Sequence, residues 1–199
     1  MLFKKIKFVL ILLLFYQTPL YSKSNSFEDF DSRNLSKYFS GIVAFGNKNN
    51  SIALDFFNST KVLINTHDPY LKRYIYSLVL EEKVSQAINV IKQNKDKNNT
   101  AFFDAYLLLL IDSLKKDNLD QSYNYLLKAN EFAQEDGFNL AVLESLRQYI
   151  YVFKEKKFLN DKKNLGKLSI ISETFQRCYL GDPNTDTYFS NLINNNESD

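Results

Sequence analysis

A small side chain recurs in this sequence at a nearly constant interval, and this interval constrains the fold more than any other feature. Ala53, Ala87 and Ser122 are separated by 34 and 35 residues. Each lies near the start of a stretch in which apolar residues return at helical spacings. Two antiparallel helices with axes about 8–10 Å apart need a small side chain where they approach and a large one beside it. The pattern therefore predicts stacked pairs of helices.

Other positions repeat with the same interval. Gly41 precedes Ala53 by twelve residues, and a bulky residue follows each small one after four positions. We expect these positions to pack the two helices of each unit against one another. The predicted packing residues are Gly41, Ala53 and Phe57 in the first unit, Ala87 and Ile91 in the second, and Ser122, Leu126 and Ala129 in the third.

These spacings resemble those of the tetratricopeptide repeat (TPR) family, whose unit is a helix–turn–helix of 34 residues. The resemblance implies an all-α chain folded as a right-handed α-solenoid of antiparallel helix pairs. It covers about three pairs in residues 34–135, and degenerate helical repeats follow over 136–193. The large aromatic residue usual early in the first helix is replaced by Lys37, Leu71 and Tyr106. Related α-solenoid repeats with similar helix pairs therefore remain an alternative.

Composition and local signals agree with an all-α chain. Only 3 Pro and 5 Gly are present, and no segment alternates between polar and apolar residues as a strand does. Asp68 is predicted to cap a helix that has Pro69 at its first position, where a missing N–H has no cost. Gly137 is predicted to end the preceding helix in a left-handed conformation.

The N-terminal segment is predicted to be a separate targeting signal. Three lysines lie within the first seven residues, and an unbroken apolar run over 8–16 follows. This order predicts a cleavable signal peptide over 1–22 and a polar linker over 23–33, while a second polar segment, 194–199, forms the tail. The apolar run is shorter than the roughly 20 residues of a membrane span, although a retained anchor remains an alternative. We expect an exported protein, located in the periplasm of a Gram-negative bacterium.

The charge balance does not favour a nucleic-acid partner. The chain has 25 basic and 23 acidic residues, and three of the lysines belong to the predicted signal peptide. The remainder has 22 basic and 23 acidic residues, a net charge of −1. Nucleic-acid binding needs a basic excess, so no such partner is predicted. Membrane contact is expected only if residues 1–22 are retained.

Residues capable of catalysis or metal binding are few. His67 is the only histidine and lies in an ordinary turn before a helix, where a structural role is expected. Cys178 is the only cysteine and is predicted to be buried on the apolar side of a helix over 163–180. That side also carries Leu165, Leu168, Ile171 and Phe175. One His and one Cys provide neither a His/Cys zinc site nor a Cys–His pair, so no cofactor, metal or enzymatic activity is predicted.

The TPR resemblance implies a concave surface lined by the first helix of each pair. Four residues at the matching positions, Tyr38, Lys72, Tyr76 and Asp104, are predicted to bind the partner. Aromatic side chains offer a large contact area and charged ones orient the partner. Apolar residues at the same positions belong either to the core or to this surface, and they are Ile42, Phe45, Val79, Leu107 and Ile111.

The sequence thus predicts an exported, non-catalytic scaffold that binds a protein or peptide partner in a helical groove. Two alternatives remain. The chain is the N-terminal helical portion of a longer envelope enzyme, or it is a membrane-tethered assembly factor that retains residues 1–22.

Overall fold

The computed structural model describes residues 31–95, 100–133, 137–163 and 166–194 of the 199-residue chain. Within these ranges the regular structure is helical and includes no strand, which confirms the predicted all-α class. In chain order the elements are α2 (Ser32–Gly46), α3 (Asn50–Asn58), the 3-10 helix η1 (Lys61–Asn65), α4 (Asp68–Leu80), α5 (Val84–Gln93), α6 (Phe103–Lys115), α7 (Leu119–Glu131), α8 (Gly137–Glu155), α9 (Lys167–Leu180) and α10 (Thr185–Asn194).

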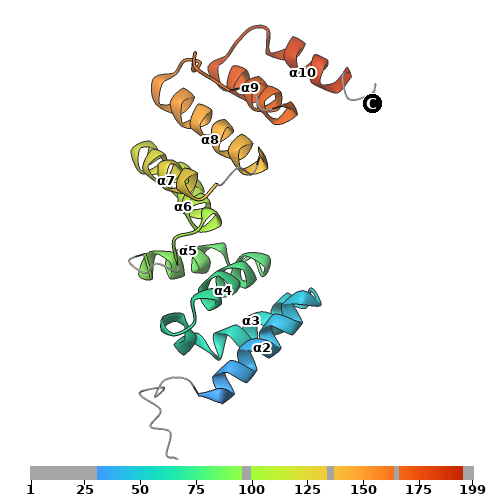
Figure 1. Cartoon of the computed structure of the whole chain (residues 1–199). Coiled ribbons are helices and arrows are strands. Elements are labelled where there is room, and N and C mark those ends of the chain that lie inside the picture. The colour runs from blue at the N-terminus through green and yellow to red at the C-terminus, as the bar shows by residue number, and fades with distance from the viewer. Residues whose placement is uncertain (1–30, 96–99, 134–136, 164–165, 195–199) are drawn as a thin grey trace, which may run out of the picture.

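The helices follow one another in space as they do in the sequence (Figure 1). Each packs mainly against the helix before it and the helix after it, and α2 also touches α4. Figure 1 shows the resulting stack as a curve, with α2 at one end and α10 at the other. Short turns join α2 to α3, α4 to α5 and α6 to α7, and we refer to these as the first, second and third helix pairs.

The predicted signal peptide (1–22) lies outside the described residues, as do most of the linker (23–33) and most of the tail. The linker was predicted too long at its C-terminal end, because α2 already begins at Ser32. The Asp31 carboxylate accepts the Arg33 N–H at 2.9 Å and caps the helix there. In the described part of the chain, no helix is both long and apolar enough to cross a membrane.

All eight residues predicted to pack the repeats are buried, on α2, α3, α5 and α7. Gly41 is the most restricted of them. A Cβ atom placed there would lie 2.8 Å from Cε1 of Phe57. The Phe57 ring is fully buried and packs against the rings of Tyr38 and Tyr70, so it has no room to move aside. No larger residue therefore fits at Gly41 while Phe57 keeps its position.

The three pairs also share one turn conformation, which the sequence did not reveal. Lys48, Glu82 and Asp117 each end a first helix with a left-handed backbone, at φ 60°, 58° and 56°. Their spacings of 34 and 35 residues repeat those of the packing residues. In each turn the next N–H donates to the carbonyl five residues earlier, as in a Schellman motif. These bonds run from Asn49 to Ala44, from Lys83 to Leu78 and from Asn118 to Ser113, at 2.9, 2.8 and 2.9 Å.

Replacing one of these turn residues by glycine is expected to stabilise the protein. A side chain disfavours the left-handed conformation, whereas glycine adopts it freely. Because glycine also loses more backbone entropy on folding, we expect Lys48→Gly or Asp117→Gly to raise the free energy of unfolding by only about 0.5–1 kcal/mol. Urea unfolding followed by circular dichroism measures this difference. Gln86→Gly, at an exposed position inside α5, is the control and should lower the same quantity by about 1 kcal/mol.

Two predicted helix ends differ in the structure. His67 precedes α4, and Asp68 is its first residue rather than its cap. Pro69 tolerates this register because no N–H in the first turn needs a helical partner. Gly137 is the first residue of α8 and does not end α7, which finishes at Glu131. The α-helix ends earlier than predicted because the Phe132 N–H donates to the carbonyl of Ala129, three residues before it, in a 3-10-type hydrogen bond.

Helix α9 is oriented opposite to the prediction. Its buried residues are the polar Ser172, Thr174 and Gln176. Cys178, predicted to be buried, is exposed. The apolar residues predicted beside it are exposed as well where they are described: Leu168, Ile171 and Phe175 (Leu165 lies outside the described residues). The reason is that the neighbouring helix, α8, also buries polar side chains, and these need polar partners.

Candidate functional site

Three of the four predicted partner-binding residues lie together on α4 and α6. The Tyr76 hydroxyl donates a hydrogen bond of 2.6 Å to Oδ2 of Asp104. Nζ of Lys72 lies 5.6 Å from the centre of the Tyr76 ring and 5.3 Å from that of Phe102. The Tyr76 and Phe102 rings meet edge to face with their centres 6.3 Å apart. We call Lys72, Tyr76, Phe102 and Asp104 the α4–α6 site.

The local sequence explains how these side chains meet. Lys72 and Tyr76 are four residues apart on α4, so they share one side of that helix. Phe102 immediately precedes α6, and Asp104 lies in the first turn of that helix. A carboxylate is favoured there by the exposed N–H groups and the helix dipole.

Electrostatics keeps the Tyr76 phenol protonated. Burial raises the pKa of this group, and both the hydrogen bond and the charge of Asp104 raise it further, while the charge of Arg73 opposes the shift. At neutral pH the hydroxyl therefore remains a donor. Oδ2 of Asp104 is accordingly engaged within the site.

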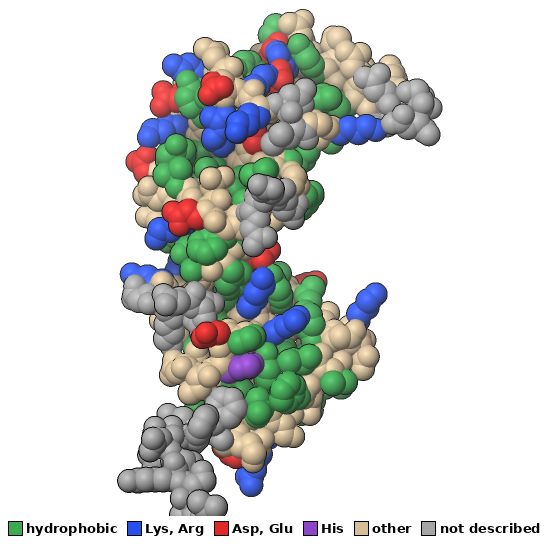
Figure 2. Space-filling view, in the orientation of Figure 1, with side chains coloured by type: hydrophobic (Ala, Val, Ile, Leu, Met, Phe, Trp, Pro, Cys, Tyr) green, Lys and Arg blue, Asp and Glu red, His purple; other side chains and the backbone are tan. Residues whose placement is uncertain are grey.

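Arg73 extends the cationic surface of α4 towards α2. Its guanidinium carbon lies 5.8 Å from the centre of the Phe45 ring. Both Arg73 and Lys72 are exposed, and neither forms an ion pair with a carboxylate among the described side chains. Figure 2 shows lysine and arginine side chains among hydrophobic ones over α4, beside the hollow on this face of the molecule. Cationic donors and aromatic surface therefore face solvent together.

Tyr38, the fourth predicted contact residue, belongs to the core instead. It is only 2% exposed, and its ring lies among those of Phe57, Tyr70 and His67. Tyr38 is one turn from Gly41 on α2, so both point towards α3 and α4 rather than outward. We therefore correct its assignment from contact surface to core. Of the apolar positions, Ile42, Phe45, Val79 and Leu107 are half-buried, and Ile111 is exposed.

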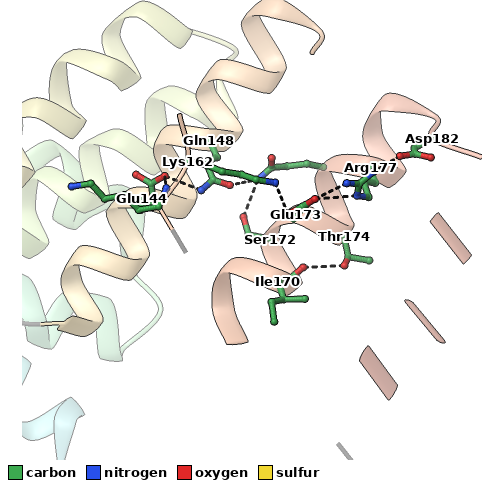
Figure 3. A network of polar contacts seen from close by, with 11 residues as sticks. Glu144, Gln148, Lys162, Ile170, Ser172, Glu173, Thr174, Arg177 and Asp182 are labelled. Carbon is green, nitrogen blue, oxygen red and sulfur yellow. Dashed lines mark hydrogen bonds and ion pairs between the residues drawn. The ribbon is translucent and has the colours of Figure 1, made fainter. Parts of the chain in front are cut away.

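A second group of polar residues lies between α8 and α9 (Figure 3). Glu144 on α8 is 8% exposed and accepts four hydrogen bonds. Arg147 donates through Nε at 2.8 Å and Nη2 at 2.9 Å. Nε2 of Gln148 donates at 2.8 Å and the Lys163 N–H at 3.0 Å. Burial raises the pKa of Glu144, but these hydrogen bonds and the Arg147 charge outweigh it and hold the pKa below its ordinary value.

The polar residues of α9 complete this group. Nε2 of Gln176 donates to Oε1 of Gln148 at 3.2 Å and to Oγ of Ser172 at 3.1 Å. Farther along α9, Arg177 pairs with Glu173 at 2.6 Å and with Asp182 at 2.5 Å. Because the buried members hydrogen-bond to one another, they join α8 to α9. We interpret this group as structural and call it the α8–α9 network. Its members are Glu144, Arg147, Gln148, Ser172, Glu173, Gln176, Arg177 and Asp182.

Sequence reasoning missed Phe102, Arg73 and the whole α8–α9 network. The adjacent pair Lys72–Arg73 and the aromatic residue before α6 are weak signals, because many helices carry such residues on a solvated face. The network has a better signal. Glu144, Arg147 and Gln148 follow a spacing of three and four residues, which places them on one side of a helix.

Among the residues that the structure describes, no three His, Cys, Asp or Glu side chains gather closely enough to hold a metal ion. No family model matches the chain, and neither a curated protein nor a solved structure matches it. The α4–α6 site is therefore interpreted from its own geometry and chemistry.

Proposed function

We propose that this chain is a TPR-like scaffold that binds a protein or peptide partner and catalyses no reaction. The observation that carries the proposal is the α4–α6 site. Tyr76 and Asp104 are 28 residues apart in sequence, and they meet on consecutive helix pairs beside an exposed lysine. Tyrosine is enriched among the residues that contribute most to protein contacts, and charged groups around such a residue orient the partner.

The proposed architecture is a right-handed α-solenoid, in which each pair repeats the geometry of the one before. Two features support it. The helices pack against their chain neighbours, and the same left-handed turn recurs at 34 and 35 residues. In such a stack the first helices of successive pairs line a concave surface. Here these helices are α2, α4 and α6, which carry the α4–α6 site and Arg73.

A cross-linking pull-down from the envelope fraction of the source organism tests this function. The bait is the full chain, run beside Lys72→Ala/Tyr76→Ala. The control is Tyr123→Ala/Lys157→Ala, which removes an exposed tyrosine and an exposed lysine away from the site. We expect one protein to be captured by the native and control baits and lost with the site variant. Equal capture by all three baits would contradict the proposed surface.

We also propose that the protein is exported to the periplasm. The support is the order of basic, apolar and small residues over 1–22. Mass spectrometry of the protein from the source organism is expected to find its first residue near position 23. An intact N-terminus in the membrane fraction would favour the tethered alternative instead.

A further inference from the structure

We propose that the α4–α6 site, together with Arg73 and Phe45, binds an acidic polypeptide segment of the partner. This inference rests on the proposed binding function and adds the chemistry of the ligand. It starts from Lys72 and Arg73, two neighbouring cations that are both exposed on α4.

The two cations are held in place without being neutralised. Lys72 lies over the rings of Tyr76 and Phe102, and Arg73 lies over that of Phe45. A ring face attracts a cation and fixes its position, but it uses none of the strong N–H donors. Both side chains therefore keep their charge and their donors for a ligand.

The nearby carboxylates offset this charge at a distance, but they do not pair with either cation. Oδ2 of Asp104 already accepts the Tyr76 hydroxyl. Asp68 lies one turn before Lys72 and is exposed, and the two form no ion pair in the described structure. No carboxylate in the described part of the chain therefore pairs with Lys72 or Arg73, and their N–H donors remain available for the carboxylates of a ligand.

The arginines of the α8–α9 network show the contrasting case. Arg147 pairs with Glu144 at 2.8 Å, and Arg177 pairs with Glu173 and Asp182 at 2.6 and 2.5 Å. There the chain supplies its own carboxylates and the guanidinium groups serve the fold. On α4 no carboxylate of the described residues pairs with Lys72 or Arg73, which is the pattern expected where a ligand supplies the partners.

The extent of the surface favours a polypeptide segment over a small anion. Phe45 on α2 and Phe102 at the start of α6 flank the two cations of α4. With neighbouring helix axes about 8–10 Å apart, the surface spans roughly 20 Å. An extended chain covers that length with about six residues. Such a segment can place carboxylates on Lys72 and Arg73 and apolar side chains on the rings.

Fluorescence anisotropy with the full chain tests the inference. The probe is a short labelled peptide of aspartate and phenylalanine, acetylated and amidated so that only side-chain carboxylates carry charge. Three competitors are compared with it. The first replaces every aspartate by asparagine, the second is the aspartate peptide with a free C-terminal carboxylate, and the third is a single-stranded oligothymidine that offers phosphates and bases.

The expected result is binding of the aspartate peptide that weakens with added salt and is at least about tenfold tighter than that of the asparagine peptide. Lys72→Gln/Arg73→Gln should lose about tenfold in affinity. Lys156→Gln/Lys157→Gln should bind like the native chain, because it removes an adjacent lysine pair elsewhere, one of which also lies over a ring. Circular dichroism should show unchanged helicity in both variants.

Several results would overturn the inference. Among the peptides, these are equal affinity for the asparagine and aspartate peptides, binding only when the C-terminal carboxylate is free, or no binding of any aspartate peptide. The other two are an equal loss of affinity in both double variants, and tighter binding of oligothymidine than of the aspartate peptide. The proposed function can be judged separately. If the pull-down still captures a protein through Lys72 and Tyr76 while the aspartate peptide fails, the scaffold proposal stands and the acidic ligand does not.

Discussion

Glu144→Gln is expected to lower the free energy of unfolding by about 2–3 kcal/mol. The native carboxylate is buried and accepts hydrogen bonds from Arg147, from Gln148 and from the Lys163 N–H. The glutamine amide has the same shape but replaces one acceptor oxygen with a donor, so it opposes donors already in place and leaves the Arg147 charge unpaired. Urea unfolding followed by circular dichroism measures the loss.

Glu155→Gln is the matched control, because Glu155 is exposed on the same helix. We expect it to change the free energy of unfolding by less than about 0.5 kcal/mol.

The dependence of stability on pH supplies a second test of the role of Glu144. Because folding lowers the pKa of Glu144, its contribution is present above the ordinary value of 4.5 and is lost as the pH falls below it. The native chain and Glu144→Gln should therefore converge in stability in acid, and a constant difference would contradict an electrostatic origin.

Gly41→Leu is expected to destabilise the protein by about 3 kcal/mol. A Cβ at this position already lies 2.8 Å from Cε1 of Phe57 and 3.2 Å from Cβ of Phe56, and a leucine adds further atoms. The buried Phe57 ring cannot yield without disturbing Tyr38 and Tyr70, so α2 and α3 have to separate. Thermal and urea unfolding measure the change.

Gly46→Ala provides the contrast on the same helix. Nothing lies within 4 Å of a Cβ placed at Gly46, so alanine gains helix propensity without overpacking. We expect a stability equal to that of the native chain or up to about 1 kcal/mol higher. A similar small effect for Gly41→Leu would show that α2 and α3 are not held together at Gly41.

The helix pairs were predictable because their signals are local. The spacing of Ala53, Ala87 and Ser122 and the apolar periodicity around them identify helices that must pack closely. The left-handed turns were not predictable, because Lys48, Glu82 and Asp117 lack the glycine by which such turns are recognised. Their conformation follows from the packing of the two helices that they join.

The candidate site was predicted only in part. The positions in the repeat correctly predicted that three residues lie on the solvent side of their helices, namely Lys72, Tyr76 and Asp104. Tyr38 occupies the matching position on α2 but lies in the core. Its ring is covered by those of Phe57 on α3 and Tyr70 on α4. Burial of an aromatic side chain depends on its neighbours in three dimensions, which helical periodicity alone does not specify.

The buried side of α9 was predicted wrongly for a related reason. Periodicity assigns the apolar side of a helix to the interior, but α8 buries Glu144 and Gln148 where α9 packs. A partner helix that meets them must contribute polar groups, here Ser172 and Gln176. Only the identity of the neighbouring helix reveals this requirement.

The packing of each helix against its chain neighbours also determines how the molecule can open. α10 packs mainly against α9, where Phe189 meets Phe175, and none of its residues is fully buried. Its detachment therefore breaks few contacts and leaves the core of α2–α6 intact. Thermal fluctuations at this end are accordingly uncoupled from the α4–α6 site, so a bound ligand would protect the amide groups of α4 and α6 from exchange while leaving those of α10 unaffected.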